Sequence, residues 1–162
     1  MAISADLETR IRRDLAAVWT ALVDVERYPE WLIASGISRV RRLDPGMLAP
    51  GSGLVIEQQV AGRAATLEGS VTAFEPERRF GFRVKDREGI SVEVEAALGA
   101  ALVDDAVTTH LRWSLRIGLP LRYRMFESMV APQARRAAEL DLEAFRQRLE
   151  APAAGVEAEP SG

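Results

Sequence analysis

The first residues of the chain alternate between apolar and polar side chains. The apolar members are Ile3, Ala5, Leu7, Thr9 and Ile11, and charged or hydroxyl side chains fill the positions between them. A period of two is typical of a strand that turns one face to a core and the other to water. The chain is therefore predicted to begin with a strand.

Two short helices are expected after this strand. Asp14 has the side chain of a good N-cap, and apolar residues follow it at helical spacing. This stripe comprises Leu15, Val18, Trp19 and Leu22. The first helix should end at residues 24–26. A second short helix or helical turn is predicted to start at residues 28–31, Tyr-Pro-Glu-Trp, with the proline early, where its missing N–H costs little.

Between residues 38 and 117 the pattern changes to strand-like segments separated by turn residues. Asp44-Pro45-Gly46 and Glu75-Pro76-Glu77 are two of these turn signals. Consecutive strands with short connections predict an antiparallel meander. The expected strands are Ser38–Leu43, Leu54–Val60, Ala64–Phe74, Arg79–Lys85, Ile90–Val103 and Val107–Ile117.

The alternation also predicts which face of a strand is buried. In the last strand one face carries Thr109, Leu111, Trp113, Leu115 and Ile117, so His110 is expected on the opposite, outward face. The strand Leu54–Val60 is ambiguous, because apolar residues share each of its faces with polar ones.

A long helix is predicted from about Pro120 to Glu150. Pro132 lacks a backbone donor and crowds the carbonyl of Ser128, so a kink is expected there. The apolar stripe runs through Leu121, Met125, Met129 and Pro132, and continues after a rotation through Ala138, Leu142, Phe145 and Leu149. Residues 151–162 are mostly Ala, Gly, Pro, Glu and Ser, which predicts a disordered tail after one domain over residues 1–150.

Composition limits the kinds of catalytic, metal-binding and nucleic-acid-binding site that the chain can contain. The 162 residues include no cysteine, which excludes thiolate nucleophiles and thiolate-bound metals, and a single histidine, His110, which excludes multi-histidine metal sites. The net charge is −3, and the arginines form no basic stripe for nucleic acid. No stretch approaches the roughly 20 apolar residues of a membrane span. We expect a cytoplasmic protein, monomeric or homodimeric, without metal or cofactor.

Several short motifs follow one another along the chain: Val18-Trp19, Leu22, Asp24, Tyr28-Pro29, Trp31, Pro50-Gly51, Phe74-Glu75-Pro76, Arg79 and Phe80. In this order they resemble the START-like (SRPBCC) superfamily in its polyketide cyclase/dehydrase and lipid-transport branch. The resemblance spans roughly residues 5–150. It implies an α+β helix-grip fold, in which a curved antiparallel sheet of about six to seven strands wraps around the long C-terminal helix, with two short helices after the first strand.

The resemblance further implies a deep apolar cavity between sheet and helix that holds a lipid, an isoprenoid or a polyketide. Trp31 is expected near its mouth, Trp113 on its concave wall, and Met125 and Met129 on its helical roof. The full expected lining is Trp31, Leu67, Val71, Phe82, Val94, Leu111, Trp113, Met125 and Met129, with Glu57, Arg63 and Tyr123 as polar candidates.

Two functions stay open on this evidence. One is a carrier or sequestering protein for an apolar small molecule, without catalysis. The other is a polyketide aromatase/cyclase or dehydrase that folds a bound poly-keto chain and uses an inward arginine, tyrosine or carboxylate with water as acid and base. The sequence offers no clear inward acid–base pair, which favours binding.

Overall fold

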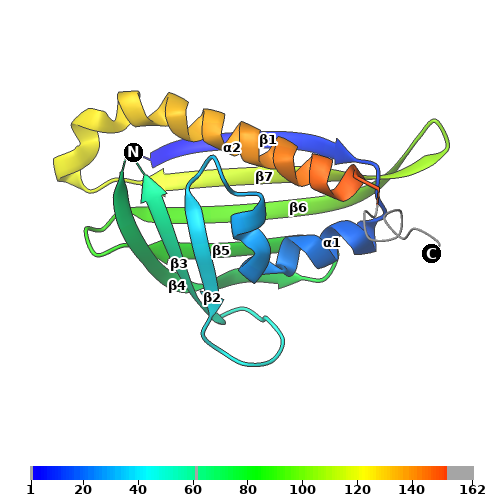
Figure 1. Ribbon diagram of the computed structural model, residues 1–162, viewed down its shortest axis with the longest axis horizontal. Coiled ribbons are helices and arrows are strands. Elements are labelled where there is room, and N and C mark those ends of the chain that lie inside the picture. The colour runs from blue at the N-terminus through cyan, green and yellow to red at the C-terminus, as the bar shows by residue number, and fades with distance from the viewer. Residues whose placement is uncertain (1, 61, 153–162) are drawn as a thin grey trace, which may run out of the picture.

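Seven antiparallel strands form one curved sheet in the computed structural model, which describes residues 2–60 and 62–152 (Figure 1). The order across the sheet is β1-β7-β6-β5-β4-β3-β2, so only the β1–β7 pair joins strands that are not consecutive. The strands are β1 (Ala2–Ile11), β2 (Ile37–Arg42), β3 (Gly53–Val60), β4 (Arg63–Glu75), β5 (Arg79–Lys85), β6 (Ser91–Val103) and β7 (Ala106–Gly118). The predicted meander is confirmed, and each predicted boundary between residues 38 and 117 lies within one residue of the observed one.

Two short helices connect β1 to β2. The first, α1 (Leu15–Val23), is capped as predicted, because the Asp14 carboxylate accepts a hydrogen bond from the N–H of Ala17 at 3.1 Å. The second is a 3₁₀ helix, η1 (Val25–Glu30), which begins three residues earlier than predicted. Val25 and Tyr28 lie one 3₁₀ turn apart and are both buried, so core packing explains the early start.

The C-terminal helix also differs from the prediction at its beginning. Residues 121–126 form a 3₁₀ helix, η2 (Leu121–Phe126), and only Glu127–Glu150 form the α-helix, α2. The predicted apolar stripe is wrong here: Leu121, Met125 and Met129 are 79%, 79% and 56% exposed. A 3₁₀ helix has three residues per turn, so a four-residue spacing does not stay on one face across this segment.

The second half of the predicted stripe is buried as expected. Ala138, Leu142 and Phe145 of α2 belong to the core. Pro132 lies inside α2, and its kink stays a prediction. The predicted disordered tail lies outside the described residues from residue 153 onward.

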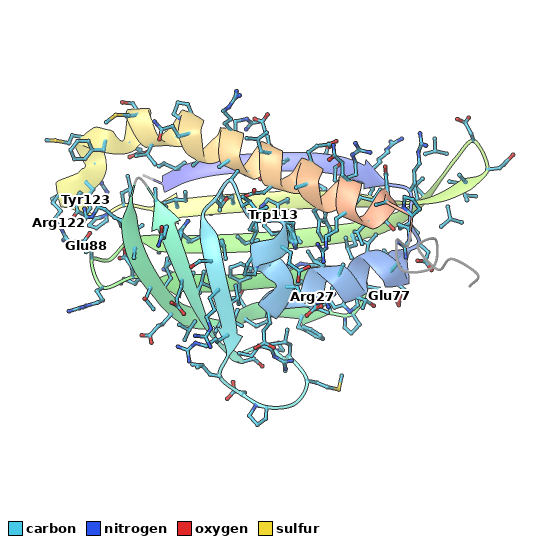
Figure 2. All side chains as sticks on the ribbon, viewed as in Figure 1. Arg27, Glu77, Glu88, Trp113, Arg122 and Tyr123 are labelled. Atoms are coloured by element: carbon cyan, nitrogen blue, oxygen red, sulfur yellow. The ribbon has the colours of Figure 1, made fainter. Side chains whose placement is uncertain are left out.

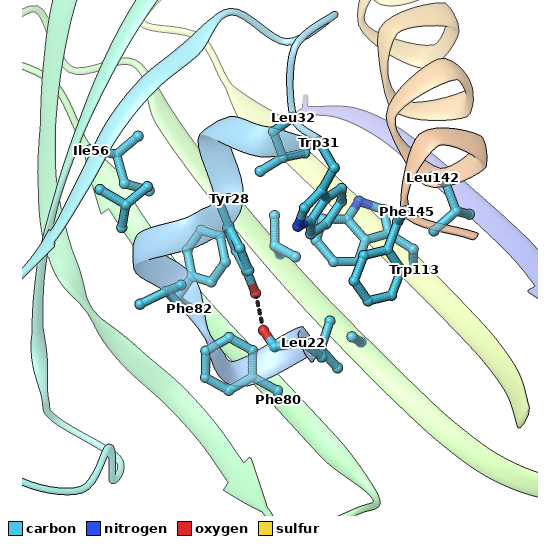
Figure 3. Packing of buried hydrophobic residues seen from close by; sticks show 14 of the residues in the cluster. Leu22, Tyr28, Trp31, Leu32, Ile56, Phe80, Phe82, Trp113, Leu142 and Phe145 are labelled. Carbon is cyan, nitrogen blue, oxygen red and sulfur yellow. Dashed lines mark hydrogen bonds between the residues drawn. The ribbon is translucent and has the colours of Figure 1, made fainter. Parts of the chain in front are cut away.

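An aromatic cluster joins the helices to the sheet (Figure 3). The ring of Trp31 lies 4.4 Å from that of Phe145, 5.0 Å from that of Tyr28 and 5.7 Å from that of Trp113. The phenol of Tyr28 donates a hydrogen bond to the carbonyl of Leu22, as the dashed line in Figure 3 shows. This cluster fixes η1 between α1, α2 and the concave face of the sheet.

The strand faces follow the predicted alternation. His110 lies on the outer face, where its Nε2 is 3.5 Å from Oε1 of Glu8 on β1. In β3, the strand with the ambiguous pattern, Leu54 and Ile56 join the core. Val55, on the other face, is buried too; its cross-strand neighbours are Arg41 and Glu68, whose aliphatic stems are suited to cover it.

Candidate ligand-binding site

A cavity of about 450 Å³ lies between the concave face of the sheet, the segment around η1, and α2. Its volume falls in the range of about 300–1,000 Å³ usual for small-molecule sites. The sheet side of its wall is mostly apolar and includes Ile56 of β3, Leu67 of β4, Phe82 of β5, Val94 of β6 and Leu115 of β7.

The cavity exists because α2 presents small side chains to the sheet in this region. Val130, Ala134, Ala137 and Ala138 form the helical wall, and an alanine methyl group leaves a gap that a leucine or methionine would fill. One to two turns later, Leu142 and Phe145 pack on the aromatic cluster and close that end. The cavity therefore lies beside the alanine-rich stretch of α2.

Of the nine apolar residues predicted to line the cavity, five are on its wall. These are Trp31, Leu67, Phe82, Val94 and Trp113. Val71 and Leu111 are fully buried core residues that do not reach the cavity. Met125 and Met129 do not roof it as expected: they lie on the outward side of η2 and α2, because the face turned to the sheet is the one that carries Val130 and Ala134.

The three polar candidates all lie outside the cavity. Glu57 faces Arg39 at 3.9 Å, and Arg63 is 80% exposed with its guanidinium 3.9 Å from Glu88. The phenol of Tyr123 donates a hydrogen bond to Oε2 of Glu88 at 2.9 Å, at the end of the molecule where η2 meets the β5–β6 turn (Figure 2). Arg63 and Tyr123 thus contact Glu88 at that end, and none of the three candidates is on the cavity wall.

The polar groups that do line the cavity were not predicted. Asp141 of α2 is 2% exposed, and its Oδ1 and Oδ2 accept hydrogen bonds from the N–H groups of Ala34 at 2.8 Å and Ser35 at 3.0 Å. The amide of Gln58 on β3 donates to the carbonyl of Ser35 at 2.7 Å. Asp141 and Gln58 thus tie the segment after η1 to both α2 and the sheet.

Gly36 lets this segment approach the sheet closely. Its φ is +76°, a conformation that L side chains rarely adopt, and a Cβ atom there would stand 1.9 Å from the carbonyl oxygen of Gln59. The N–H of Gln59 donates to the carbonyl of Gly36 at 2.8 Å. Only glycine fits this position, which places Ala34 and Ser35 opposite Asp141.

The second acidic group of the wall lies in the β5–β6 turn. Oδ1 of Asp86 accepts hydrogen bonds from the N–H groups of Glu88 at 2.9 Å and Ile90 at 2.8 Å. Asp86 and Asp141 are the charged residues of the cavity wall, and no arginine, lysine or histidine is among the described residues that form it.

Burial shifts two pKa values at this site. Desolvation raises the pKa of the Asp141 carboxyl, and the hydrogen bonds from Ser35 and Ala34 offset part of that rise. Desolvation also raises the pKa of the Tyr28 phenol far above its usual value, with a further rise from the nearby charge of Asp24. Tyr28 is therefore a neutral hydrogen-bond donor, already engaged with the carbonyl of Leu22.

Other kinds of site find little support in the part of the chain that the structure describes. No group of three or more His, Asp or Glu side chains there could hold a metal ion. A second depression, of about 440 Å³ between β1 and α2, is open and lined largely by charged residues such as Glu8, Arg135 and Glu143. None of the helices in residues 2–60 and 62–152 is both long and apolar enough to cross a membrane.

Comparison with known proteins agrees with this architecture. A family model described as polyketide cyclase/dehydrase and lipid transport matches residues 2–150. The fold is similar to the Zhui aromatase/cyclase from Streptomyces sp. R1128, with a TM-score of 0.73 and 17% identity over 98% of each chain. It is also similar to Ara h 8.0201, with a TM-score of 0.66 and 14% identity over 92% of this chain and 98% of the other. No curated protein sequence matches this chain.

Proposed function

Because the chain belongs to the polyketide cyclase/dehydrase and lipid transport family, we propose that it binds an apolar small molecule between the sheet and α2 and carries or sequesters it. The observation that supports this most is the cavity of about 450 Å³, with a wall that is mostly apolar. Burial of apolar ligand surface there would contribute roughly 25 cal/mol per Å² to binding. This contribution to the binding free energy does not depend on a charge on the ligand.

The state of the polar wall groups favours binding over catalysis. A cyclase needs an acid and a base within reach of the proton that moves. Tyr28 donates to Leu22, Gln58 donates to Ser35, and Asp141 accepts from two backbone N–H groups. Each of these groups helps to hold the fold, and no described wall residue is a histidine, lysine or arginine that could act as the partner acid of Asp141. The likeness to an aromatase/cyclase, at 17% identity, is a likeness of fold.

Contact quenching of tryptophan fluorescence tests the proposal. Trp31 and Trp113 line the cavity, whereas Trp19 packs on Phe74 and Phe80, with ring distances of 5.3 and 6.4 Å, and is not on the cavity wall. A neutral bromoalkanol such as bromoundecanol quenches tryptophan only on contact. We expect saturable quenching of the native protein at a ratio of one probe per chain.

Matched variants locate the binding. In Trp19→Phe, quenching should persist in full, and in the double variant with Trp31→Phe and Trp113→Phe the remaining fluorescence should resist the probe. Circular dichroism would verify that each variant is folded. An absence of saturable quenching in the native protein, or its loss in Trp19→Phe alone, would contradict the proposal.

Native mass spectrometry of the purified protein would complement this assay. A co-purified small molecule would identify the ligand class directly. If a poly-keto chain were turned over when incubated with the protein, the cyclase function would replace the carrier function.

A further inference from the structure

The charged groups on the cavity wall have one sign only. The chain contains 21 lysine and arginine residues, yet none of the described cavity-lining residues is cationic, and two carry carboxylates, Asp86 and Asp141. The ion pairs among the described residues include neither of these acids. A ligand in the cavity therefore meets negative charge without a neighbouring counter-ion.

Hydrogen bonds hold the Asp141 side chain in one position on the cavity wall. It projects from α2, is 2% exposed, and receives one backbone N–H on each oxygen, at 2.8 and 3.0 Å. Such pairing of both oxygens suits the ionised form, which accepts hydrogen bonds without donating any. A carboxylate has about four acceptor positions, and the two backbone N–H groups and the Ser35 side chain occupy three of them. Acceptor capacity is thus left for a donor on a ligand.

Asp86 acts from the turn between β5 and β6. Its Oδ1 atom accepts two hydrogen bonds, both from backbone N–H groups. The Oδ2 atom receives no hydrogen bond within the described part of the chain. The two acids come from separate elements, α2 and the β5–β6 turn, so the negative charge does not depend on one side chain.

We propose that the cavity selects apolar molecules whose polar end is a hydroxyl or an ammonium group and excludes those that end in a carboxylate. This inference rests on the proposed function, because it names the ligand class of the same site. A hydroxyl or ammonium group can donate a hydrogen bond to Asp141, whereas a carboxylate would bring a third negative charge close to this buried acid. Charge repulsion of this kind is strong where water is excluded.

Competition among three probes of equal chain length tests the selectivity. Decanol, decylamine and decanoate would each displace bromoundecanol at about pH 8, where an alkylamine is protonated and a carboxylic acid is ionised. We expect decanoate to bind at least tenfold more weakly than decanol, and decylamine to bind at least as tightly as decanol. Asp141→Asn should reduce the difference between decanol and decanoate, and the double variant with Asp86→Asn should reduce it to less than threefold.

A control and a second variant keep the test decisive. Glu139→Gln removes a carboxylate of α2 that is not on the cavity wall and pairs with Arg135 at 3.2 Å, so it should leave the selectivity unchanged. If Asp141→Asn does not fold, Gln133→Lys adds a cation at an exposed position of the cavity wall and should raise decanoate affinity relative to decanol. Equal affinity of the native protein for decanoate and decanol would overturn the inference while leaving the carrier function intact. No binding by any of the three would overturn both.

Discussion

Replacement of Ala134 by phenylalanine should fill the cavity without disturbing the fold. Ala134 lies on the helical wall, so a larger side chain at this position extends into the space of about 450 Å³. A phenyl ring buries at least about 150 Å² of surface. At roughly 25 cal/mol per Å², that burial offers nearly 4 kcal/mol, offset in part by lost rotamer freedom.

In a close-packed core the same substitution would destabilise the protein by about 1–3 kcal/mol, because existing side chains would have to move. We therefore expect the free energy of unfolding of Ala134→Phe to equal or exceed that of the native protein. Occupation of the space should weaken bromoundecanol binding at least tenfold, or about 1.4 kcal/mol.

Urea unfolding followed by circular dichroism measures the first quantity, provided that the slope of the transition stays constant. Tryptophan quenching measures the second, and phenylalanine adds no new fluorophore. Leu140→Phe is the matched control, since Leu140 is 53% exposed on the same helix. A loss of more than about 1 kcal/mol with unchanged probe affinity would refute the existence of usable space beside Ala134.

Three further outcomes follow from the structure. The pKa of Tyr28 is raised in the folded state, so its contribution to stability is complete below about pH 10 and falls as the pH rises toward the folded-state pKa. In Tyr123→Phe, absorbance titration should show no phenolate until the protein unfolds in alkali, and a phenolate signal from folded protein near pH 10 would contradict the assignment. His110→Ala should change the free energy of unfolding by no more than about 0.5 kcal/mol in urea titration, because the side chain lies on the outer face. Gly69→Ala should lower the thermal midpoint clearly, since its Cβ would stand 1.8 Å from the carbonyl oxygen of Arg83; an unchanged midpoint would show that β4 and β5 can separate there.

The strands were predictable from sequence because each has one face against the core. A period of two survives wherever that condition holds, and Asp, Gly and Pro at the turns mark where it ends. In β7 this pattern alone places Trp113 inside and His110 outside, as observed. The fold could therefore be derived from local pattern and turn chemistry.

The helical wall of the cavity was not predictable in the same way. Met125 and Met129 carry a strong apolar signal but lie outside, and the true wall carries Ala134 and Ala137, whose signal is weak. A helix with two candidate stripes is oriented by the elements that it packs against, and its own sequence does not contain that information.

Asp141 escaped prediction for a different reason. A charged residue in a helix usually faces solvent. Its partners are backbone N–H groups of Ala34 and Ser35, more than 100 residues away, and backbone groups leave no signature in a sequence. The one hint was its position beside Leu142 and between Ala138 and Phe145, on the buried face of α2.

The pairing of β1 with β7 also determines when parts of the fold can form during protein synthesis. β1 ends at Ile11, and β7, its neighbour in the sheet, begins at Ala106, so the 94 residues 12–105 separate the two strands. At about 5–20 residues per second, a ribosome takes roughly 5 to 20 seconds to make that stretch. During this interval β1 has no neighbouring strand with which to form backbone hydrogen bonds. The helix α2, which packs on β1, is synthesised later still. The cavity can thus form only after α2 has been synthesised, and a ligand can be enclosed between sheet and helix only from then on.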